Sequence, residues 1–329
     1  MDYGQGVTIS IVVPMYNESE NIDAFYNRMI NVLNKTGDSF EIVCINDGSQ
    51  DDTLERLERL NKNDPRVKVI NLSRNFGQEI ALSAGIDFAT GQAVIPIDAD
   101  LQDPPELIPE LLAKWREGYE VVYATRVKRE GETWLKRFTA HSFYKVISKL
   151  TPFKIPMDTG NFRVMDRKVV DAIKQLREQH RFMKGLFSWV GFRQIGVPYT
   201  REPRFAGKTK WNYWKLWNFA LEGITSFSYL PLQLATYLGM FVSLGALVFG
   251  TYILIKTLLM GNAVPGYPSL MTVMLFLGGV QLFTIGIIGE YVGRIYNESK
   301  RRPLYFVSNT IGFDNAFLQN PQQQKVESL

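Results

Sequence analysis

Two long stretches without charged residues constrain the fold of this 329-residue chain more than any other feature. No Asp, Glu, Lys or Arg occurs from Gly223 to Ile255, and none occurs from Thr257 to Gly289. An α-helix needs about 20 apolar residues to cross a bilayer, and core helices of soluble proteins rarely stay apolar on all sides. The intervening GNAVPGYPS has two glycines and two prolines, which indicates a turn. We therefore predict a membrane hairpin over residues 230–296, in preference to a buried pair of soluble helices.

Basic residues flank both ends of this hairpin, whereas the turn between the helices is uncharged. Lys208, Lys210 and Lys215 precede the first span, and Arg294 and residues 300–302 follow the second. Because positively charged flanks stay in the cytoplasm, we expect a two-span protein of the plasma (inner) membrane with its N-terminal region in the cytoplasm. The chain then divides into a globular domain over residues 1–200, a basic loop and amphipathic juxtamembrane helix over 201–229, the spans over 230–296 and a cytoplasmic tail over 297–329.

The globular region alternates between strand-like and helix-like segments. Apolar runs lie near residues 8–14, 40–46, 67–72, 92–98 and 120–125, with helical patterns between them. This alternation is typical of βαβ units and predicts an α/β, Rossmann-like fold with a parallel sheet covered on both faces. The single cysteine, Cys44, lies inside one run, so we expect it in the core and expect no disulfide within the chain.

Polar residues follow four of these strands at the point where each ends. They are Tyr16–Glu18, Asp47–Ser49, Arg74–Gly77 and Asp98–Asp100. Ligands of such sheets bind beyond the carboxyl ends of the strands, so these loops are candidates for one site. Each loop alone is also what an ordinary turn looks like, since Asn, Asp, Gly and Ser occur in any turn.

The fourth strand ends in the acidic sequence DADLQD. In extended chain, residues two positions apart point to the same side, which pairs Asp98 with Asp100. Two carboxylates, with the amide oxygen of Gln102, suit a hard divalent cation such as Mg²⁺ or Mn²⁺. We expect Asp103 instead to cap the next helix, because Pro104 and the proline after it suit the first helical positions.

The sequence also disfavours several other functions. It has neither a G-x-x-x-x-G-K-[ST] phosphate loop nor G-x-G-x-x-G after the first strand, which disfavours P-loop nucleotidases and dinucleotide-binding enzymes. The net charge of +4 gives no sign of a nucleic-acid partner.

An ordered set of motifs resembles the family-two glycosyltransferases with the A-type fold: SIVVPMYNESENI, INDGSQDDT, LSRNFGQEIAL, DADLQDPPELIP, DTGNFRVMDR and REPRFAGKTKW. Within that family the chain is similar to the dolichyl-phosphate mannose synthase branch. With its two C-terminal spans it is most similar to the bacterial bactoprenol (undecaprenyl-phosphate) glucosyltransferases of O-antigen modification in lipopolysaccharide. The resemblance extends from about Ser10 to about Arg302.

This resemblance implies roles for particular residues. Catalytic roles fall to Asp158, Arg201 and Asp100, with Asp158 near the anomeric centre as an orienting group. Pro14, Tyr16 and Glu18 would border the base and ribose, Asp47 would contact the uracil or ribose, Asp98 would contact the nucleotide, Asp100 and Gln102 would hold the metal, and Gly160, Asn161 and Phe162 would line the sugar subsite.

Two basic stretches would serve the phosphates of donor and acceptor. Arginine binds phosphate through two parallel hydrogen bonds and lysine acts as a point charge. We expect Arg126, Arg137, Arg201 and Lys210 to bracket these phosphates; attraction to lipid head groups alone is the alternative. Aromatic residues from Trp211 to Trp217 predict an amphipathic helix at the bilayer surface.

The implied reaction is inverting, metal-dependent transfer of a sugar from a nucleotide diphosphate sugar to polyprenyl phosphate. The donor expected from the resemblance is UDP-glucose; mannose, an amino-arabinose and N-acetylated sugars stay open. The alternatives are a processive polysaccharide synthase, a non-catalytic nucleotide-sugar-binding scaffold and a lipid flippase. The chain lacks the Gln-x-x-Arg-Trp of polymerising members. Glycines in both spans permit close helix packing, so a homo-oligomer is expected.

Overall fold

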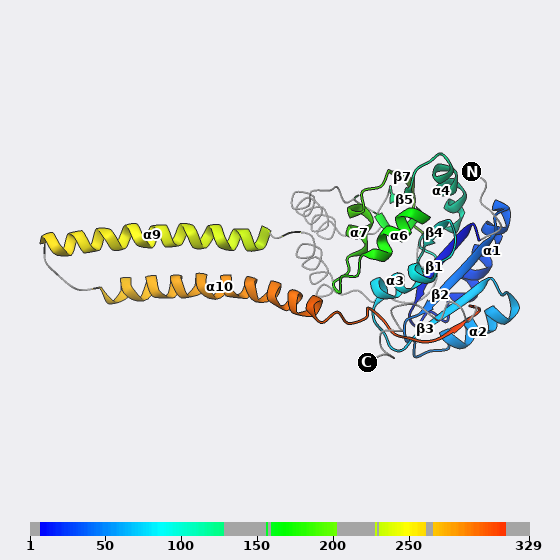
Figure 1. The fold of residues 1–329 in the computed structure, drawn as a ribbon, viewed down its shortest axis with the longest axis horizontal. Helices are drawn as coiled ribbons and strands as arrows, with labels where there is room; N and C mark the ends of the chain where they lie inside the picture. The colour runs from blue at the N-terminus through cyan, green and yellow to red at the C-terminus, as the bar shows by residue number, and fades with distance from the viewer. Residues whose placement is uncertain are drawn as a thin grey trace. The chain divides into compact units, whose positions relative to one another are not determined.

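The computed structural model describes residues 7–127, 156, 159–202, 228, 230–260 and 266–313. The chain forms two compact units. One comprises residues 1–220 together with residues 302–329, and the other comprises residues 221–301. Figure 1 shows the strands and most of the helices in the first unit and two long helices in the second. Residues 302–313, which follow the hairpin, therefore belong to the globular unit.

An eight-stranded sheet forms the centre of the first unit, in the order β7-β5-β6-β4-β1-β2-β3-β8. The strands are β1 (Ile9–Met15), β2 (Phe40–Asn46), β3 (Val67–Leu72), β4 (Ala93–Pro96), β5 (Val121–Arg126), β6 (Thr159–Asp166), β7 (Gln194–Tyr199) and β8 (Val307–Ile311). The four central strands β4, β1, β2 and β3 are parallel neighbours. The predicted α/β fold is thus confirmed, and its five strands all form.

The sheet is mixed, although the sequence predicted a parallel one. β6 lies between β4 and β5 and is antiparallel to both, and β8 is antiparallel to β3 at the opposite edge. β7 pairs in parallel with β5. β8 and its partner β3 are far apart in the sequence. β6 also pairs with β4, and β7 pairs with β5 although β6 lies between them in the chain. None of these three strands lies within the repeated strand–helix pattern on which the prediction was based.

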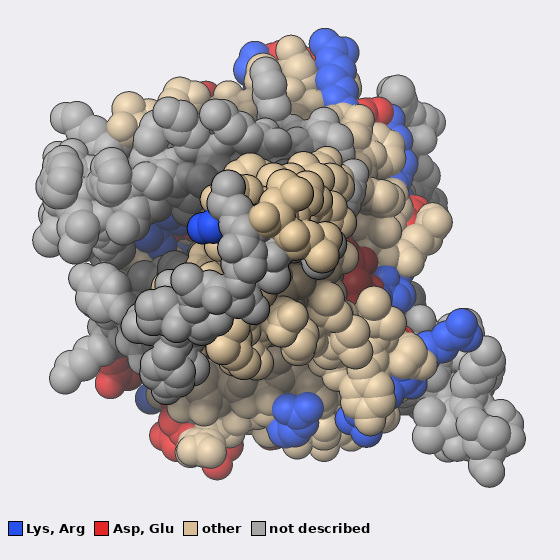
Figure 2. All heavy atoms as spheres, turned by 90° about the vertical axis from the view of Figure 1, so that its left-hand side faces the viewer, with Lys and Arg blue, Asp and Glu red and all other residues tan. Residues whose placement is uncertain are grey.

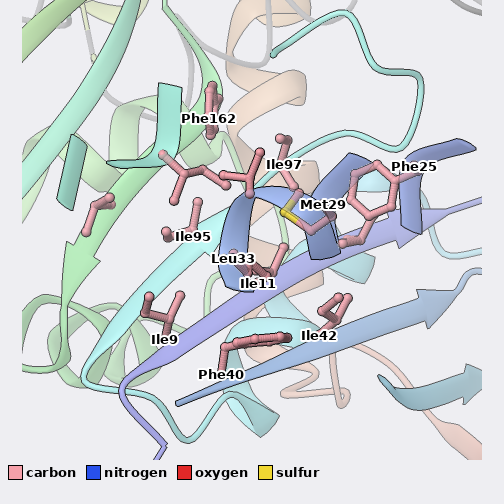
Figure 3. Packing of buried hydrophobic residues seen from close by; sticks show 14 of the residues in the cluster. Ile9, Ile11, Phe25, Met29, Leu33, Phe40, Ile42, Ile95, Ile97 and Phe162 are labelled. Carbon is pink, nitrogen blue, oxygen red and sulfur yellow. The ribbon is translucent and has the colours of Figure 1, made fainter. Parts of the chain in front are cut away.

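Helices pack against the sheet through their apolar side chains. Among the described residues of the globular unit they are α1 (Ile22–Thr36), α2 (Thr53–Asn63), α3 (Gln78–Phe88), the 3-10 turn η1 (Pro105–Leu107), α4 (Ile108–Arg116), α6 (Arg167–Gln175) and α7 (Met183–Trp189). Phe25, Met29 and Leu33 of α1 recur every four residues and belong to the same buried cluster as Ile11 and Ile42 (Figure 3). Cys44 is buried in this cluster, as predicted, and burial raises the pKa of its thiol to about 12.

The second unit contains the helices α9 (Leu230–Met260) and α10 (Tyr267–Ser299). Both contain a segment that is long and apolar enough to cross a membrane, Pro231–Ile253 and Thr272–Ser299. Their large apolar side chains are exposed, which is expected where lipid rather than protein surrounds a helix. Figure 2, turned by 90° from Figure 1, shows uncharged atoms grouped where the two helices are seen end-on. The structure therefore supports the predicted pair of apolar helices.

A buried carboxylate joins three strands at the amino ends of the sheet. Glu41 of β2 is 1% exposed and accepts hydrogen bonds from Ser10 Oγ at 2.5 Å and from the Thr90 backbone N–H at 2.7 Å. Its other oxygen lies 2.8 Å from Lys68 Nζ. Burial alone would raise the pKa of Glu41, but the bonds from Lys68, Ser10 and Thr90 outweigh it and hold the pKa below its ordinary value.

We predict that Glu41→Gln lowers the free energy of unfolding of the globular unit by about 1–3 kcal/mol at pH 7, because partly buried Lys68 loses its counter-charge. A carboxyl whose folded pKa is lowered stabilises the fold above its unfolded pKa and loses that effect as the pH falls through the folded pKa. The difference between the two proteins should therefore shrink below about pH 4. Thermal unfolding of the detergent-solubilised wild-type and variant proteins, at pH 7 and below about pH 4, tests this prediction. Equal melting temperatures of the two proteins at pH 7 would contradict it.

Candidate active site

The loops that follow β1 and β2 are tied to each other by hydrogen bonds. The backbone N–H of Asn17 donates to Ser49 Oγ at 2.9 Å, and the backbone N–H of Gln50 donates to Asn17 Oδ1 at 2.8 Å. The N–H of Glu18 donates to Thr53 Oγ1 at 3.0 Å. Asn17 has φ of 52°, which Asn tolerates better than most side chains. The structure thus brings together two of the loops that the sequence assigned to one site.

Asp47 connects this pair to the loop after β3. Its two carboxylate oxygens accept the backbone N–H groups of Phe76 and Gly77, at 2.7 and 2.9 Å. Burial raises the pKa of Asp47, and the two N–H donors only partly offset the effect. Gly48 beside it has φ of 65°, and a Cβ there would lie 2.5 Å from the backbone nitrogen of Asn75. Asp47 therefore braces the neighbouring loop, and its predicted contact with uracil or ribose stays a prediction.

The other residues predicted to border the nucleotide lie at the carboxyl end of β1. Pro14 belongs to the strand, and Tyr16 and Glu18 follow it; all three are partly buried. Glu18 Oε2 accepts a hydrogen bond from Asn21 Nδ2 at 2.6 Å. Their position at this edge of the sheet is compatible with the predicted role, which stays a prediction.

The acidic segment after β4 folds into a strained turn. Asp98 Oδ1 accepts from Gln78 Nε2 at 2.9 Å, and Asp100 Oδ1 accepts from the backbone N–H of Gln102 at 3.1 Å. Leu101 between them has φ of 58°. A bulky residue in this left-handed region costs about 1–3 kcal/mol and persists only where its surroundings impose it. This backbone conformation brings Asp100 and Gln102 together at the tip of the strand.

The carboxylates of Asp98, Asp100 and Asp103 lie close together at this tip, so it is unfavourable for all three to be ionised. Burial, followed by the negative charges of Asp103 and Asp100, raises the pKa of Asp98 to about 7, against the opposing effect of Arg201 and Arg126. A divalent cation would relieve this repulsion. Within the part of the chain that the structure describes, no three His, Cys, Asp or Glu side chains form a metal site by themselves. Two carboxylates with substrate oxygens are the usual ligands of protein-bound Mg²⁺, so the donor set fits such an ion.

Asp103 does not cap a helix, and that expectation was wrong. The residue at the cap position of η1 is Pro104, and no side chain caps this turn. Asp103 is 2% exposed and accepts the hydroxyl hydrogen of Tyr199. Its Oδ1 lies 3.9 Å from Arg126 Nη2 and 3.9 Å from Arg201 Nε. The two guanidinium groups stabilise the buried carboxylate, so Asp103 is directed into the site rather than toward the helix.

Arg126 and Arg201 are the predicted phosphate ligands that the structure places beside the acidic tip. Arg126 ends β5, and its Nε donates to Tyr199 Oη at 3.1 Å. The Nε of Arg201 is buried and has no hydrogen-bond partner among the described residues. Buried polar groups are normally satisfied, so this donor is available to an anionic ligand.

The first residues of β6 lie next to Arg126. A Cβ at Gly160 would be 2.9 Å from Arg126 Nη2, so a larger residue there would displace the guanidinium. Arg163 is 2% exposed and donates to the backbone oxygens of Gly160 at 2.8 Å and Asn161 at 3.3 Å. The buried Oδ1 of Asn161 has no partner among the described residues. These contacts are compatible with the sugar subsite that the resemblance implies for Gly160 and Asn161, and that role stays a prediction.

Phe162 does not fit that subsite. Its side chain is 1% exposed and packs edge-to-face on the ring of Tyr199, with centroids 6.4 Å apart. Side chains alternate across a strand, so Phe162 points into the core when its neighbour Asn161 points the other way. The expectation that Phe162 lines the sugar subsite is therefore wrong.

Three predicted site residues, Asp158, Arg137 and Lys210, lie outside the described residues, as does most of the predicted juxtamembrane helix. The sequence analysis in turn missed Tyr199, which joins Asp103 to Arg126. Tyr199 ends β7, and Pro198 in this strand disfavours a strand assignment from sequence. The only available indication was the alternation of apolar residues from Ile195 to Tyr199.

We predict that Mn²⁺ binding in the presence of UDP weakens about tenfold per pH unit below pH 7, because a proton on Asp98 competes with the ion. Asp103→Asn removes a neighbouring negative charge and so lowers the pKa of Asp98. The midpoint, which is the pH at which Mn²⁺ binding falls to half its maximum, should therefore move to lower pH in this variant. Electron paramagnetic resonance of free Mn²⁺ measures the binding. Asp38→Asn, which changes a carboxylate at the opposite end of β2, should leave the midpoint unchanged. An unshifted midpoint in Asp103→Asn would contradict the prediction.

Known protein families match both units of the chain. The model for glycosyl transferase family 2 matches residues 10–174, and the model for the GtrB C-terminal hairpin matches residues 230–295. An uncharacterised glycosyltransferase of Synechocystis sp. is 61% identical over 94% of this chain and 97% of its own length. The bactoprenol glucosyl transferase of Shigella phage SfV is 51% identical over 92% of this chain and 98% of its own.

Solved structures of glycosyltransferases are more distant. Glucosyl-3-phosphoglycerate synthase from Mycobacterium tuberculosis, in complex with Mn²⁺, UDP-glucose and phosphoglyceric acid, is 20% identical with a TM-score of 0.45, over 67% of this chain and 78% of that one. The family therefore rests on the sequence matches, which span both the sheet and the apolar helices. They show that the chain is a glycosyltransferase that belongs to glycosyl transferase family 2 and carries the GtrB C-terminal hairpin.

Proposed function

We propose that this glycosyltransferase moves glucose from UDP-glucose to a polyprenyl phosphate, with undecaprenyl phosphate as the acceptor and inversion at the anomeric carbon. Relatives named bactoprenol glucosyl transferases, from Shigella phage SfV and, as a prophage homologue, from Escherichia coli, are 51% and 50% identical to it. Their similarity covers 92% and 91% of this chain. The substrates named here are inferred from those relatives.

The observation that carries the proposal is the position of two arginines beside the acidic tip. Arg126 and Arg201 approach Asp103, close to Asp98 and Asp100, and Arg201 keeps a buried donor without a described partner. Transfer from a nucleotide sugar to a lipid phosphate brings two phosphorylated groups into one site. Such a site needs positive charge for both groups. A cation held by the acidic tip, together with the guanidinium groups of the two arginines, can supply it.

The chain topology supports a membrane acceptor. Residues on both sides of the hairpin belong to the same sheet, so the chain must cross a membrane an even number of times between β7 and β8. Two apolar helices satisfy this requirement. The basic flanks then favour the cytoplasmic face for the globular unit. A lipid phosphate at that face would then lie on the same side of the membrane as the site.

In the proposed reaction, an oxygen of the lipid phosphate attacks the anomeric carbon as the bond from that carbon to the UDP oxygen breaks. The electron pair of the broken bond stays on UDP. A phosphate monoester loses its second proton near pH 6, so the acceptor is already anionic and needs no general base. Asp158 would orient the reacting groups, and Arg126 and Arg201 would bind phosphate oxygens.

A divalent cation fits this site through Asp98, Asp100 and Gln102. When bound, it would neutralise negative charge on the departing diphosphate. Leu101, in its left-handed conformation, holds Asp100 and Gln102 in position before substrate arrives. Mg²⁺ and Mn²⁺ both accept such oxygen ligands.

We predict that detergent-solubilised protein, supplied with labelled UDP-glucose, undecaprenyl phosphate and Mg²⁺ or Mn²⁺, forms one lipid-linked monosaccharide. Chelation by EDTA should abolish the product and excess Mn²⁺ should restore it. A polymeric product would instead indicate a processive synthase, and donor binding without turnover would indicate a scaffold. A panel of labelled UDP- and GDP-sugars identifies the donor.

We also predict that Asp100→Asn reduces turnover by about 100-fold or more, because it weakens stabilisation of the leaving group. Asp158→Asn should retain more activity, since an orienting residue need not transfer a proton. Asp38→Asn is the matched control; Asp38 pairs with Arg116 at 2.6 Å at the opposite end of β2. A larger loss for Asp158→Asn than for Asp100→Asn would contradict the assigned roles.

A further inference from the structure

The residues that follow the membrane hairpin form part of the globular sheet. This return segment, residues 302–313, contains β8, which pairs antiparallel with β3 in the register Val69↔Ile311, Ile70↔Thr310 and Asn71↔Asn309. Figure 1 shows it extending from the end of α10 to the edge of the sheet. None of the proposed catalytic roles uses this segment, so its contacts require a separate explanation.

Side chains anchor the return segment before β8 begins. The hydroxyl of Tyr305 donates to Asp87 Oδ2 at 2.8 Å, and Asp87 also accepts two hydrogen bonds from Arg177, at 2.7 and 2.9 Å. Gln179 donates to the backbone oxygen of Arg302 at 2.5 Å. A partly buried Arg–carboxylate pair with two parallel hydrogen bonds is a stable anchor. The segment is thus fixed to α3 and to the residues after α6 before it reaches the sheet.

From there, one hydrogen-bonded route leads to Asp47. The backbone N–H of Ser73 donates to the oxygen of Phe306 at 2.9 Å. Ser73 is the first residue after β3, and the same loop supplies the N–H groups of Phe76 and Gly77 that bind Asp47. The return segment therefore fixes the start of the loop that Asp47 holds at its other end.

A second route runs through a row of asparagines. Asn71 donates to Asn309 Oδ1 at 2.8 Å, and Asn46 donates to Asn71 Oδ1 at 2.8 Å. Asn46 Oδ1 then accepts the backbone N–H of Ser49 at 3.2 Å, and Ser49 Oγ accepts that of Asn17. These bonds connect β8 to the loops after β2 and β1, which are the loops predicted to hold the nucleotide.

We propose that the return segment positions the donor-nucleotide loops, with Asn309 and Tyr305 as positioning residues. The inference rests on the proposed function for the identity of the donor. Ordering a loop costs conformational entropy, and a loop held in place beforehand binds its ligand more tightly. Because the segment continues directly from α10, the nucleotide side of the site is completed by residues that the chain supplies only after the membrane hairpin.

The test compares Asn309→Leu, which keeps the size but removes the acceptor, with Asn309→Asp, which keeps an acceptor for Asn71. Asn309→Leu should raise KM for UDP-glucose about three- to tenfold and leave kcat within about twofold, whereas Asn309→Asp should behave like wild type. Thr310→Val, an isosteric change one position along β8, is the control. Tyr305→Phe, which keeps the ring, should shift KM in the same direction as Asn309→Leu.

Amide hydrogen exchange of the full-length protein in detergent, without substrate, gives a readout that does not depend on activity. In Asn309→Leu, residues 46–50 and 73–77 should exchange faster, while the remaining sheet keeps its protection. Unchanged exchange in these loops, or a fall in kcat without a rise in KM, would overturn the inference. If wild-type protein does not use UDP-glucose, the proposed function fails, and the exchange experiment still decides whether the return segment positions these loops.

Discussion

The balance of charge at the carboxyl end of β4 governs the rest of the site. Three carboxylates gather there, and two arginines each lie 3.9 Å from one of them, Asp103. The contacts of Asp103 are made within the protein, because its Oδ1 accepts the hydroxyl hydrogen of Tyr199 and lies near both guanidinium groups. Asp98 and Asp100 add further negative charge at the same tip, and this crowding together with burial raises the pKa of Asp98 against the opposing effect of both arginines. Repulsion among these carboxylates is unfavourable for the protein alone. Binding of a cation together with an anionic substrate would offset that repulsion.

The mixed sheet divides the site into two halves of different origin. The parallel strands β1, β2 and β3 end in loops that hydrogen bonds join into one framework, through Asn17, Ser49 and Asp47. The strands on the other side of β4 contribute the cations, because Arg126 ends β5 and Arg201 follows β7. Antiparallel β6 places Gly160 where Arg126 needs space. The acidic tip lies at the junction, so nucleotide and phosphate chemistry can meet there.

Local sequence patterns predicted the part of this arrangement that depends on local structure. Strands rich in Val and Ile, separated by amphipathic helices, predicted the α/β fold, and the polar residues at the strand ends indicated the edge that carries the site. The rest depends on pairing between distant segments. The direction of Asp103 is decided by Tyr199 and two arginines from other strands, although the adjacent prolines favour a helix cap. Phe162 lies beside Gly160 and Asn161, which are predicted to line the sugar subsite, and only the face of β6 on which it lies decides that it belongs to the core.

The late position of β8 in the chain has a consequence for biosynthesis. The hydrogen-bonding edge of β3 is made early, but its partner strand is translated only after both apolar helices. At typical synthesis rates the interval between the two strands is on the order of ten seconds to a minute. During that time β3 presents an open edge, which is prone to pair with other chains. Synthesis of the hairpin and closure of this edge are therefore successive events, and the edge of β3 stays open for as long as the hairpin is being made.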